Sequence, residues 1–420
     1  MPIGMNDRES EAKQQLRGRV ILVVESPLSE RDARRFGLSR LLEAGLVLQV
    51  WEVAPLTLPR AENQWTERPA GIDVLRMSTV AALTAACHEI EEDDTIISLV
   101  GVFPGQIDRC RDVLVAISAT PAKLAGVSGR ALWDGSMPDV ETRAYEREWP
   151  RGVFAALKVK YWMVRVLKAA IGRVHMIPYF ANRRRRRYGI RALDIVWVAT
   201  TNKAFDPLFL DAQTRTRALH AFDYDLVLDL ENSRLEDSAT IAYVDWLGPL
   251  HPDIETLGMT LPFRSPEVHF GQLRALFDLI EDALGMPVVV AAHPRATPGT
   301  LDEWYGNREV VYAGTAEVMA RSRLVLLSYP SDSIAMVVAL RKPVLVLGSM
   351  RDYRYEKDLK ASLCRLLHCS RVLLEAPPVP LRMPVVDEAV YDGFFSQFIM
   401  GPDGDPSPFW DSVAMDLVRD

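Results

Sequence analysis

Short runs of apolar residues recur along the chain, and stretches with helical spacing follow most of them. The first run, Val20–Val24 in RVILVVESPLSERDARRFGLSRLLEAGLVLQVWEVAPL, has the pattern of a strand buried on both faces. A predicted helix, Arg31–Glu43, and a second apolar run, Leu46–Val53, come next. A strand, a helix and a strand of these lengths form a βαβ unit, so the chain is expected to open with a parallel sheet.

Further apolar runs have the length of strands. They lie at Thr95–Val100, Ile195–Ala199, Leu226–Leu230, Thr240–Val244, Pro287–Ala292, Val310–Tyr312, Leu324–Ser328 and Pro343–Leu347. Predicted helices at Phe270–Leu284, from about Thr315, and at Asp332–Leu340 alternate with the later runs. This alternation predicts a second parallel α/β domain after the first.

The length of the chain also favours two domains, because 420 residues exceed what one hydrophobic core usually organises. A polar stretch, ENSRLEDSAT, divides the two series of strands. We therefore predict an α/β fold of two Rossmann-like domains that face each other across a cleft. Residues 1–235 form the first domain, with a basic insertion at 151–191, and residues 236–385 form the second. The aromatic-rich residues 386–420 are predicted as C-terminal helices that cross back onto the first domain.

The composition is that of a soluble globular protein, with 49% hydrophobic and 25% charged residues. The net charge of −7 argues against general nucleic-acid binding. The N-terminus, MPIGMNDRESEAKQQLRGR, is polar, so neither a signal peptide nor a membrane span is expected. Four cysteines in so long a chain give no disulfide framework, and we expect a cytoplasmic protein with reduced thiols.

One segment departs from the acidic balance of the chain. Residues 151–191 carry twelve Lys or Arg and no Asp or Glu, and they include five consecutive arginines at 183–187. Cations interleave with aromatic and aliphatic residues in the first part, a pattern that suits an anionic membrane surface. We therefore expect peripheral contact with the inner face of the cell membrane. The alternatives are a core helix with a solvated basic flank and, without any module signature, RNA binding.

Polar residues stand at the predicted carboxyl ends of several strands: Glu25, Asp245, His293, Arg295, Ser331 and Ser333. Carboxyl ends of parallel strands meet at one edge of a sheet, where open α/β folds bind their ligands. The amides and hydroxyls at the start of the helix Asp332–Leu340, together with the imidazole and the guanidinium, suit a phosphate.

Each of these residues also has an ordinary structural alternative. Ser331 or Asp332 can cap the helix, a His-Pro pair is common in loops, and Glu25 can serve as a charge at a helix entry. No GxGxxG or GxxxxGK[ST] loop follows any strand, so a hydride-transfer dehydrogenase or a P-loop kinase is not expected. No DxD-like pair follows a suitable strand, and we predict neither a metal nor another cofactor.

The order HPR, then a serine-rich turn about forty residues on, a helix and a strand beginning KPVLVL resembles the second domain of GT-B glycosyltransferases. The resemblance is closest to enzymes of bacterial surface polysaccharides: polysialyltransferases, Kdo transferases and teichoic-acid polymerases. In that family an HP motif and a Ser-Ser or Ser-Thr motif hold the phosphate and ribose of a cytidine nucleotide. The resemblance assigns His293 to the first role, and Ser331 with Ser333 to the second.

Segments in both domains are also similar to glycosyltransferase-like proteins of O-antigen and capsule clusters, among them HAFDYDLVL, VDWLGPLHPDIETLG and AGTAEVMARSRLVLLSY. The donor-binding residues expected from the resemblance are His293, Pro294, Arg295, Gly314, Thr315, Ser331 and Ser333. The family's turn is closer to His-x-Ser-Thr, whereas Tyr329 and Asp332 stand at its first and last positions here. A carboxylate at this place repels a phosphate unless it points away or caps the helix.

The resemblance implies an inverting, metal-independent enzyme that moves a sugar from a nucleotide sugar to a glycan or lipid-linked acceptor. The favoured donor is a CMP-activated nonulosonic acid or Kdo. Inversion needs a base for the acceptor hydroxyl; Asp245 is the first candidate and Glu25 the second, ahead of Asp223 and Asp225. Two alternatives stay open: a nucleotide-sugar epimerase of the same fold, and a catalytically silent GT-B scaffold, for which Asp332 is the hint.

Overall fold

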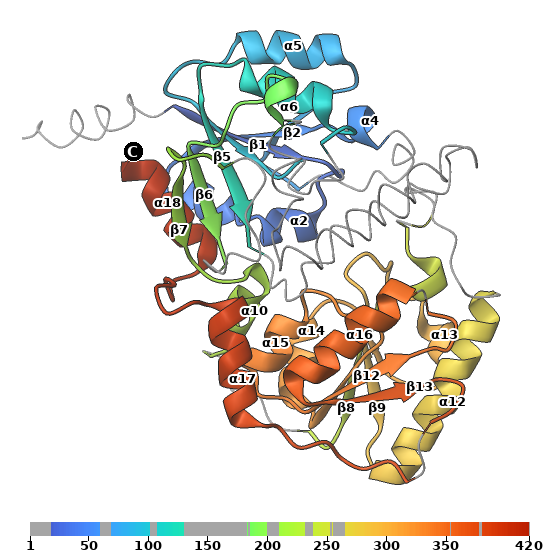
Figure 1. The fold of residues 1–420 in the computed structure, drawn as a ribbon. Coiled ribbons are helices and arrows are strands. Elements are labelled where there is room, and N and C mark those ends of the chain that lie inside the picture. Colours follow the sequence, from blue (N-terminus) through green and yellow to red (C-terminus); the bar gives the residue numbers. More distant parts are fainter. Residues whose placement is uncertain are drawn as a thin grey trace, which may run out of the picture.

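The computed structural model describes residues 18–58, 69–100, 107–129, 183, 185–199, 210–231, 238–252, 254, 265–352, 354–377 and 380–419. In this part of the chain the strands form two parallel sheets, of seven and six strands, with helices packed against them (Figure 1). The strand orders are β3-β2-β1-β4-β5-β6-β7 and β10-β9-β8-β11-β12-β13. Each order runs outward in both directions from the first strand of its sheet, which is the doubly wound arrangement. The predicted fold of two Rossmann-like domains is confirmed.

The first domain is built on the seven-stranded sheet. Its strands are β1 (Arg19–Val24), β2 (Val47–Glu52), β3 (Asp73–Arg76), β4 (Thr95–Ser98), β5 (Lys123–Ser128), β6 (Ile195–Val198) and β7 (Arg215–Ala218). Its helices are α2 (Glu30–Arg35), α3 (Leu38–Glu43), α4 (Ala54–Thr57), α5 (Val80–His88) and α6 (Arg111–Ser118). The predicted runs Val20–Val24, Leu46–Val53, Thr95–Val100 and Ile195–Ala199 form the inner strands β1, β2, β4 and β6. Inner strands of a parallel sheet are covered on both faces, so their sequences are continuously apolar.

The second domain is built on the six-stranded sheet. Its strands are β8 (Ile241–Val244), β9 (Val288–Ala291), β10 (Val310–Val311), β11 (Leu324–Leu327), β12 (Val344–Gly348) and β13 (Ser370–Leu373). Its helices are η4 (Gly248–Leu250), α12 (Pro266–Leu284), α13 (Asp302–Tyr305), α14 (Thr315–Arg321), α15 (Ile334–Ala339) and α16 (Arg354–Leu367). The helices α10 (Phe222–Glu231), α17 (Glu388–Phe394), η5 (Phe395–Ile399) and α18 (Phe409–Arg419) connect the domains. The predicted domain boundary at 235 and 236 lies outside the described residues and stays a prediction.

The predicted strand Leu226–Leu230 is wrong, because these residues belong to helix α10. Val227 and Leu230 are buried three residues apart, whereas Leu226 is exposed. This is the spacing of one helix face, and a short apolar run alone does not separate a buried strand from such a face.

The predicted helix Arg31–Glu43 is divided into α2 and α3 at Gly37. Gly37 has a φ of 56°, in the left-handed region that favours glycine. A Cβ atom at this position would lie 2.2 Å from Cγ of Trp410 in α18. The glycine therefore allows both the turn between the helices and the close approach of α18.

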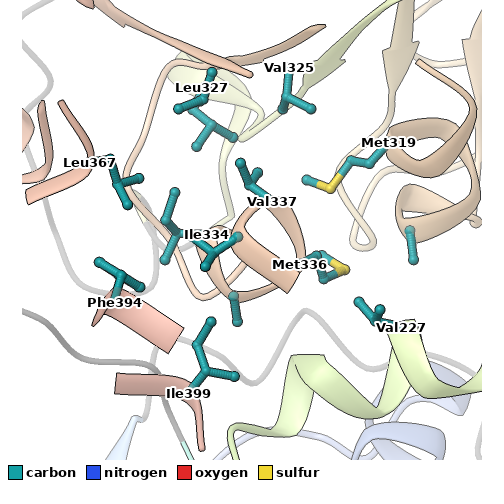
Figure 2. Close-up of a cluster of buried hydrophobic side chains, with 14 of the residues drawn as sticks. Val227, Met319, Val325, Leu327, Ile334, Met336, Val337, Leu367, Phe394 and Ile399 are labelled. Atoms are coloured by element: carbon teal, nitrogen blue, oxygen red, sulfur yellow. The ribbon is translucent and has the colours of Figure 1, made fainter. Parts of the chain in front are cut away.

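The two domains exchange helices. Residues Val227 and Leu230 of α10 belong to the hydrophobic core of the second domain together with residues of α15. Figure 2 shows Val227 next to Met336 of α15. In the other direction, α18 places Phe409, Trp410, Val413 and Ala414 in the core of the first domain. Within the predicted C-terminal helices at 386–420, α17 and η5 pack on the second domain instead, through Tyr391, Phe394, Phe398 and Ile399.

Hydrogen bonds join the two places where the chain crosses between the domains. The amide of Ala221 donates to the carbonyl of Ile399 at 2.8 Å. The amide of Phe409 donates to Oδ1 of Asp225 at 2.9 Å, and the ring of Tyr224 contacts that of Phe395 edge to face. The crossings thus form one connected bridge between the domains.

The structure describes only the end of the predicted basic insertion at 151–191, namely residue 183 and residues 185–191. Arg185 is 4% exposed and donates to the carbonyl of Ile190 at 3.0 Å, whereas Arg186 and Arg187 are exposed. The run of five arginines therefore does not form a uniformly solvated surface, and the predicted membrane contact of its first part lies outside the described residues. Among the described helices, none combines the length and the apolar character that a membrane span requires.

We predict that Gly37→Ala destabilises the protein by about 2–4 kcal/mol. Alanine is strained in the left-handed backbone conformation of this position, and its methyl group would displace the side chain of Trp410. The matched control is Gly285→Ala, which has a similar φ of 66° but no atom within 4 Å of the added carbon. Urea unfolding of both variants measures the difference. Equal losses in the two variants would contradict the packing role of Gly37.

Candidate functional site

The predicted site residues of the second domain gather at the carboxyl edge of its sheet. Val244 of β8 pairs in register with Ala291 of β9 and Leu327 of β11, so the residues after these strands lie side by side. Asp245, His293, Pro294, Arg295, Ser331 and Ser333 follow these three strands, and Gly314 and Thr315 follow β10. Gly314, with a φ of 103°, precedes α14, and Thr315 is the first residue of that helix.

Asp245 is buried and fully engaged in hydrogen bonds. Its Oδ1 atom accepts from the amide of Leu247 at 2.9 Å and from the hydroxyl of Tyr305 at 2.7 Å. Its Oδ2 atom accepts from the amide of His293 at 3.2 Å. Burial raises the pKa of Asp245, against the hydrogen bond from Tyr305. At 3% exposure this carboxylate ties the loop after β9 to the end of β8, whereas a base must reach the acceptor.

A hydrogen bond to the ring of His293 fixes which of its two nitrogens carries the proton. Its Nδ1 atom accepts a hydrogen bond from the amide of Arg295 at 3.2 Å, so the neutral ring carries its proton on Nε2. Burial lowers the pKa of His293 to about 3, and the nearby His251, Arg31 and Arg295 contribute to the decrease. The imidazole is therefore neutral near pH 7, and Nε2 is a hydrogen-bond donor. The ring of His251 lies edge to face against it, with centroids 5.0 Å apart.

The two predicted serines lie together in the loop after β11. Their hydroxyl oxygens are 2.7 Å apart and hydrogen-bonded to each other. Helix α15 has six residues and begins at Ile334, which is shorter than the predicted helix Asp332–Leu340. Ser333 precedes the helix without a side-chain capping bond. The two hydroxyl groups can therefore donate and accept hydrogen bonds at the edge of the sheet. The dipole of a six-residue helix adds little to their attraction for an anion.

Asp332 points to the opposite domain. Its Oδ2 atom lies 3.0 Å from Nη2 of Arg35 in α2, and the same guanidinium nitrogen is 3.8 Å from Asp223. Burial alone would lower the pKa of Arg35, but Asp223 and Asp332 outweigh burial and hold it above its ordinary value. The carboxylate was expected to repel a phosphate unless it points away or caps the helix; in the structure it is paired with a cation of the first domain.

The remaining candidate bases lie in or beside the first domain. Glu25 follows β1, and its Oε1 atom is 2.5 Å from Nη2 of Arg109 and accepts from the thiol of Cys110 at 3.5 Å. Asp223 lies near Arg35, as described above. Asp225 accepts a hydrogen bond from the amide of Phe409, the first residue of α18. Burial raises the pKa of Asp225 to about 6.

Several residues of this region were not predicted from the sequence. Arg31 and Arg35 stand four residues apart on α2, immediately after the first strand, and His251 belongs to a second His-Pro pair. The rings of Trp246 and Tyr329 stack at 5.5 Å beside the same sheet edge. The basic sequence ERDARR after a strand end was a usable signal, but its partner Asp332 is 297 residues away. Among the described residues, no group of three or more His, Cys, Asp or Glu is placed to hold a metal ion.

No protein-family model matches the chain, and no curated protein matches it. Several solved structures are similar over nearly the whole chain. The calicheamicin glycosyltransferase CalG4 is 14% identical, with a TM-score of 0.49, over 96% of this chain and 99% of its own. SnogD from Streptomyces nogalater is 11% identical, with a TM-score of 0.48, over 96% and 99%. The spinosyn forosaminyltransferase SpnP is 10% identical, with a TM-score of 0.41, over 96% and 94%. The assignment of the fold rests on the strand orders and on the exchange of helices between the domains.

We predict that Asp245→Ala lowers the free energy of unfolding by about 2–3 kcal/mol, because two buried donors and the part-buried amide of His293 lose their acceptor. Asp282→Ala, which removes an exposed acid of α12, is the control and should change stability by less than about 0.5 kcal/mol. Chemical denaturation measures both. A loss for Asp245→Ala no larger than that of the control would contradict the positioning role of this carboxylate.

Proposed function

We propose that the protein is a glycosyltransferase that moves a sugar from a nucleotide sugar to an acceptor held between its two domains. One observation carries the proposal: the residues that suit a phosphate lie together at the sheet edge of the second domain, and this edge meets α2 of the first domain. The ion pair between Arg35 and Asp332 marks the meeting point. A donor on the second domain would therefore present its sugar toward the first domain, as the resemblance of the HPR and serine motifs implies.

The leaving phosphate would be held by side chains of the second domain. Nε2 of His293 would donate to one phosphate oxygen, and Arg295 would add a charge with bidentate geometry. Ser331 and Ser333 supply hydroxyl groups beside them. Negative charge grows on the phosphate as the bond to the sugar breaks, so these groups stabilise the transition state more than the bound donor.

Glu25 is the base that we propose, because Asp245 is only 3% exposed. The side chain of Glu25 is paired with Arg109, but it is 16% exposed at the carboxyl end of β1. The carboxylate of Glu25 would take the proton of the acceptor hydroxyl as its oxygen attacks the anomeric carbon. The bond between that carbon and the phosphate oxygen breaks at the same time, and its electron pair leaves with the nucleotide. Attack from the face opposite the leaving group inverts the configuration, and the cations replace a metal in this scheme.

The resemblance to surface-polysaccharide enzymes supports a narrower proposal. The donor would be a CMP-activated nonulosonic acid or Kdo, and the acceptor a growing surface glycan or a lipid-linked precursor. The basic segment 151–191 would keep the enzyme at the inner face of the membrane, close to such an acceptor.

Nucleotide binding tests the donor site. We expect one of CMP, CDP, UDP and GDP to raise the thermal midpoint, and Arg295→Ala to weaken its binding by ten- to a hundredfold because a charged hydrogen bond is lost. His293→Gln, which keeps an N–H donor, should bind more tightly than His293→Ala. Arg321→Ala, an exposed change at the opposite edge of the sheet, is the control. A protein that none of the four nucleotides stabilises would contradict the proposed donor site.

Transfer activity tests the base. With the nucleotide sugar identified by binding, Glu25→Gln should lower the transfer rate by at least about a hundredfold and leave nucleotide affinity unchanged, since only the proton acceptor is removed. The matched change Asp282→Asn, at an exposed acid, should leave the rate unchanged. Full activity of Glu25→Gln would exclude this residue as the base. A product formed from the donor alone would instead support the epimerase.

A further inference from the structure

Helix α2 brings two arginines of the first domain to the donor edge of the second. Figure 1 shows α2 on the side of the first domain that faces the second. Arg31 and Arg35 are four residues apart, so they lie on one face of this helix. Since Nη2 of Arg35 lies 3.0 Å from the carboxylate of Asp332, the same face meets the loop that contains Ser331 and Ser333.

The two arginines differ in their partners. Arg35 lies between two carboxylates, Asp332 and Asp223, which balance its charge. In the described part of the chain, Arg31 forms an ion pair with Asp32 alone, at 3.4 Å. Asp32 in turn accepts the hydroxyl of Ser29 at 2.7 Å through its other oxygen. The charge of Arg31 is thus the less compensated of the two.

Arg31 faces a cation of the other domain. Burial lowers the pKa of Arg31, and the like charges of Arg35 and Arg295 contribute to the decrease. Arg31 and Arg295 also both lower the pKa of His293. Arg295 belongs to the loop after β9, where its amide donates to Nδ1 of His293. Arg31 belongs to α2, whose Arg35 contacts Asp332 in the loop after β11. Each domain thus contributes one guanidinium group to the region around this sheet edge. Arg31 is half-buried and Arg295 is exposed. Two like charges repel each other, whereas an anion that binds between them is attracted to both.

We propose that Arg31 is the first domain's own ligand for the leaving phosphate, which it would hold together with Arg295 across the cleft. This inference rests on the proposed function and adds to it a residue from the opposite domain. The phosphate of the departing nucleotide gains negative charge in the reaction, so a second cation on the far wall stabilises it most when the bond to the sugar breaks.

Isothermal titration with CMP and with UDP tests the proposal in the full chain. We expect Arg31→Ala to weaken binding of the nucleotide that the wild type prefers by about tenfold. Arg34→Ala is the matched control, because Arg34 lies on the same helix but is exposed. The affinity of this variant for the nucleotide should stay within about twofold of wild type. Arg31→Gln serves as the second variant if Arg31→Ala does not fold, and thermal unfolding without nucleotide shows whether each variant is intact.

A double-mutant cycle tests whether one phosphate bridges the two walls. If it does, the losses for Arg31→Ala and Arg295→Ala will not add in the double variant. If Arg31→Ala and Arg31→Gln bind as tightly as wild type while Arg295→Ala binds at least tenfold more weakly, this inference is overturned and the donor site stands. If Arg295→Ala and His293→Ala also bind as tightly as wild type, the proposed function itself fails.

Discussion

The contact of Trp410 with the turn at Gly37 is the interaction on which the interdomain region depends. The indole N–H of Trp410 donates to the carbonyl of Arg35 at 2.8 Å, and its ring occupies the space beside the glycine. The last helix of the described chain therefore fixes the end of α2, and the direction of α2 decides where Arg31 and Arg35 point. The hydrogen bond from the amide of Ala221 to the carbonyl of Ile399 helps to hold the second domain where Asp332 pairs with Arg35.

Much of the fold follows from local pattern, and the exceptions have physical causes. The runs around Val20–Val24 and Leu324–Ser328 are buried on both faces, so their sequence is continuously apolar and predicts strands directly. Strand β7, RTRA, was missed because an edge strand exposes its side chains and carries no apolar run. Residues Leu226–Leu230 were predicted as a strand because a short apolar run does not show which of its side chains will be buried. The buried face of α10, with Val227 and Leu230, is defined by its packing on the second domain.

Some features of the candidate site also follow from local sequence, whereas others depend on tertiary packing. The positions of His293, Arg295 and Ser331 could be predicted, because residues that follow parallel strands must share one edge of the sheet. The contacts of Asp245 could not, since its burial depends on Tyr305 in another helix. Nor could the sequence indicate what faces Asp332, because the partner lies on the other domain and is brought there by tertiary packing alone.

The exchange of helices bears on how the chain folds during its synthesis. Most of the seven-stranded sheet emerges from the ribosome long before Phe409 and Trp410, which belong to its core. Until α18 is made, Leu38 and Leu41 lack the packing that α18 gives them in this core, so they present apolar surface to solvent. Domains otherwise tend to fold in the order of their translation. Here the first domain translated is the last to complete its core, so the growing chain has to be kept from aggregating throughout that interval.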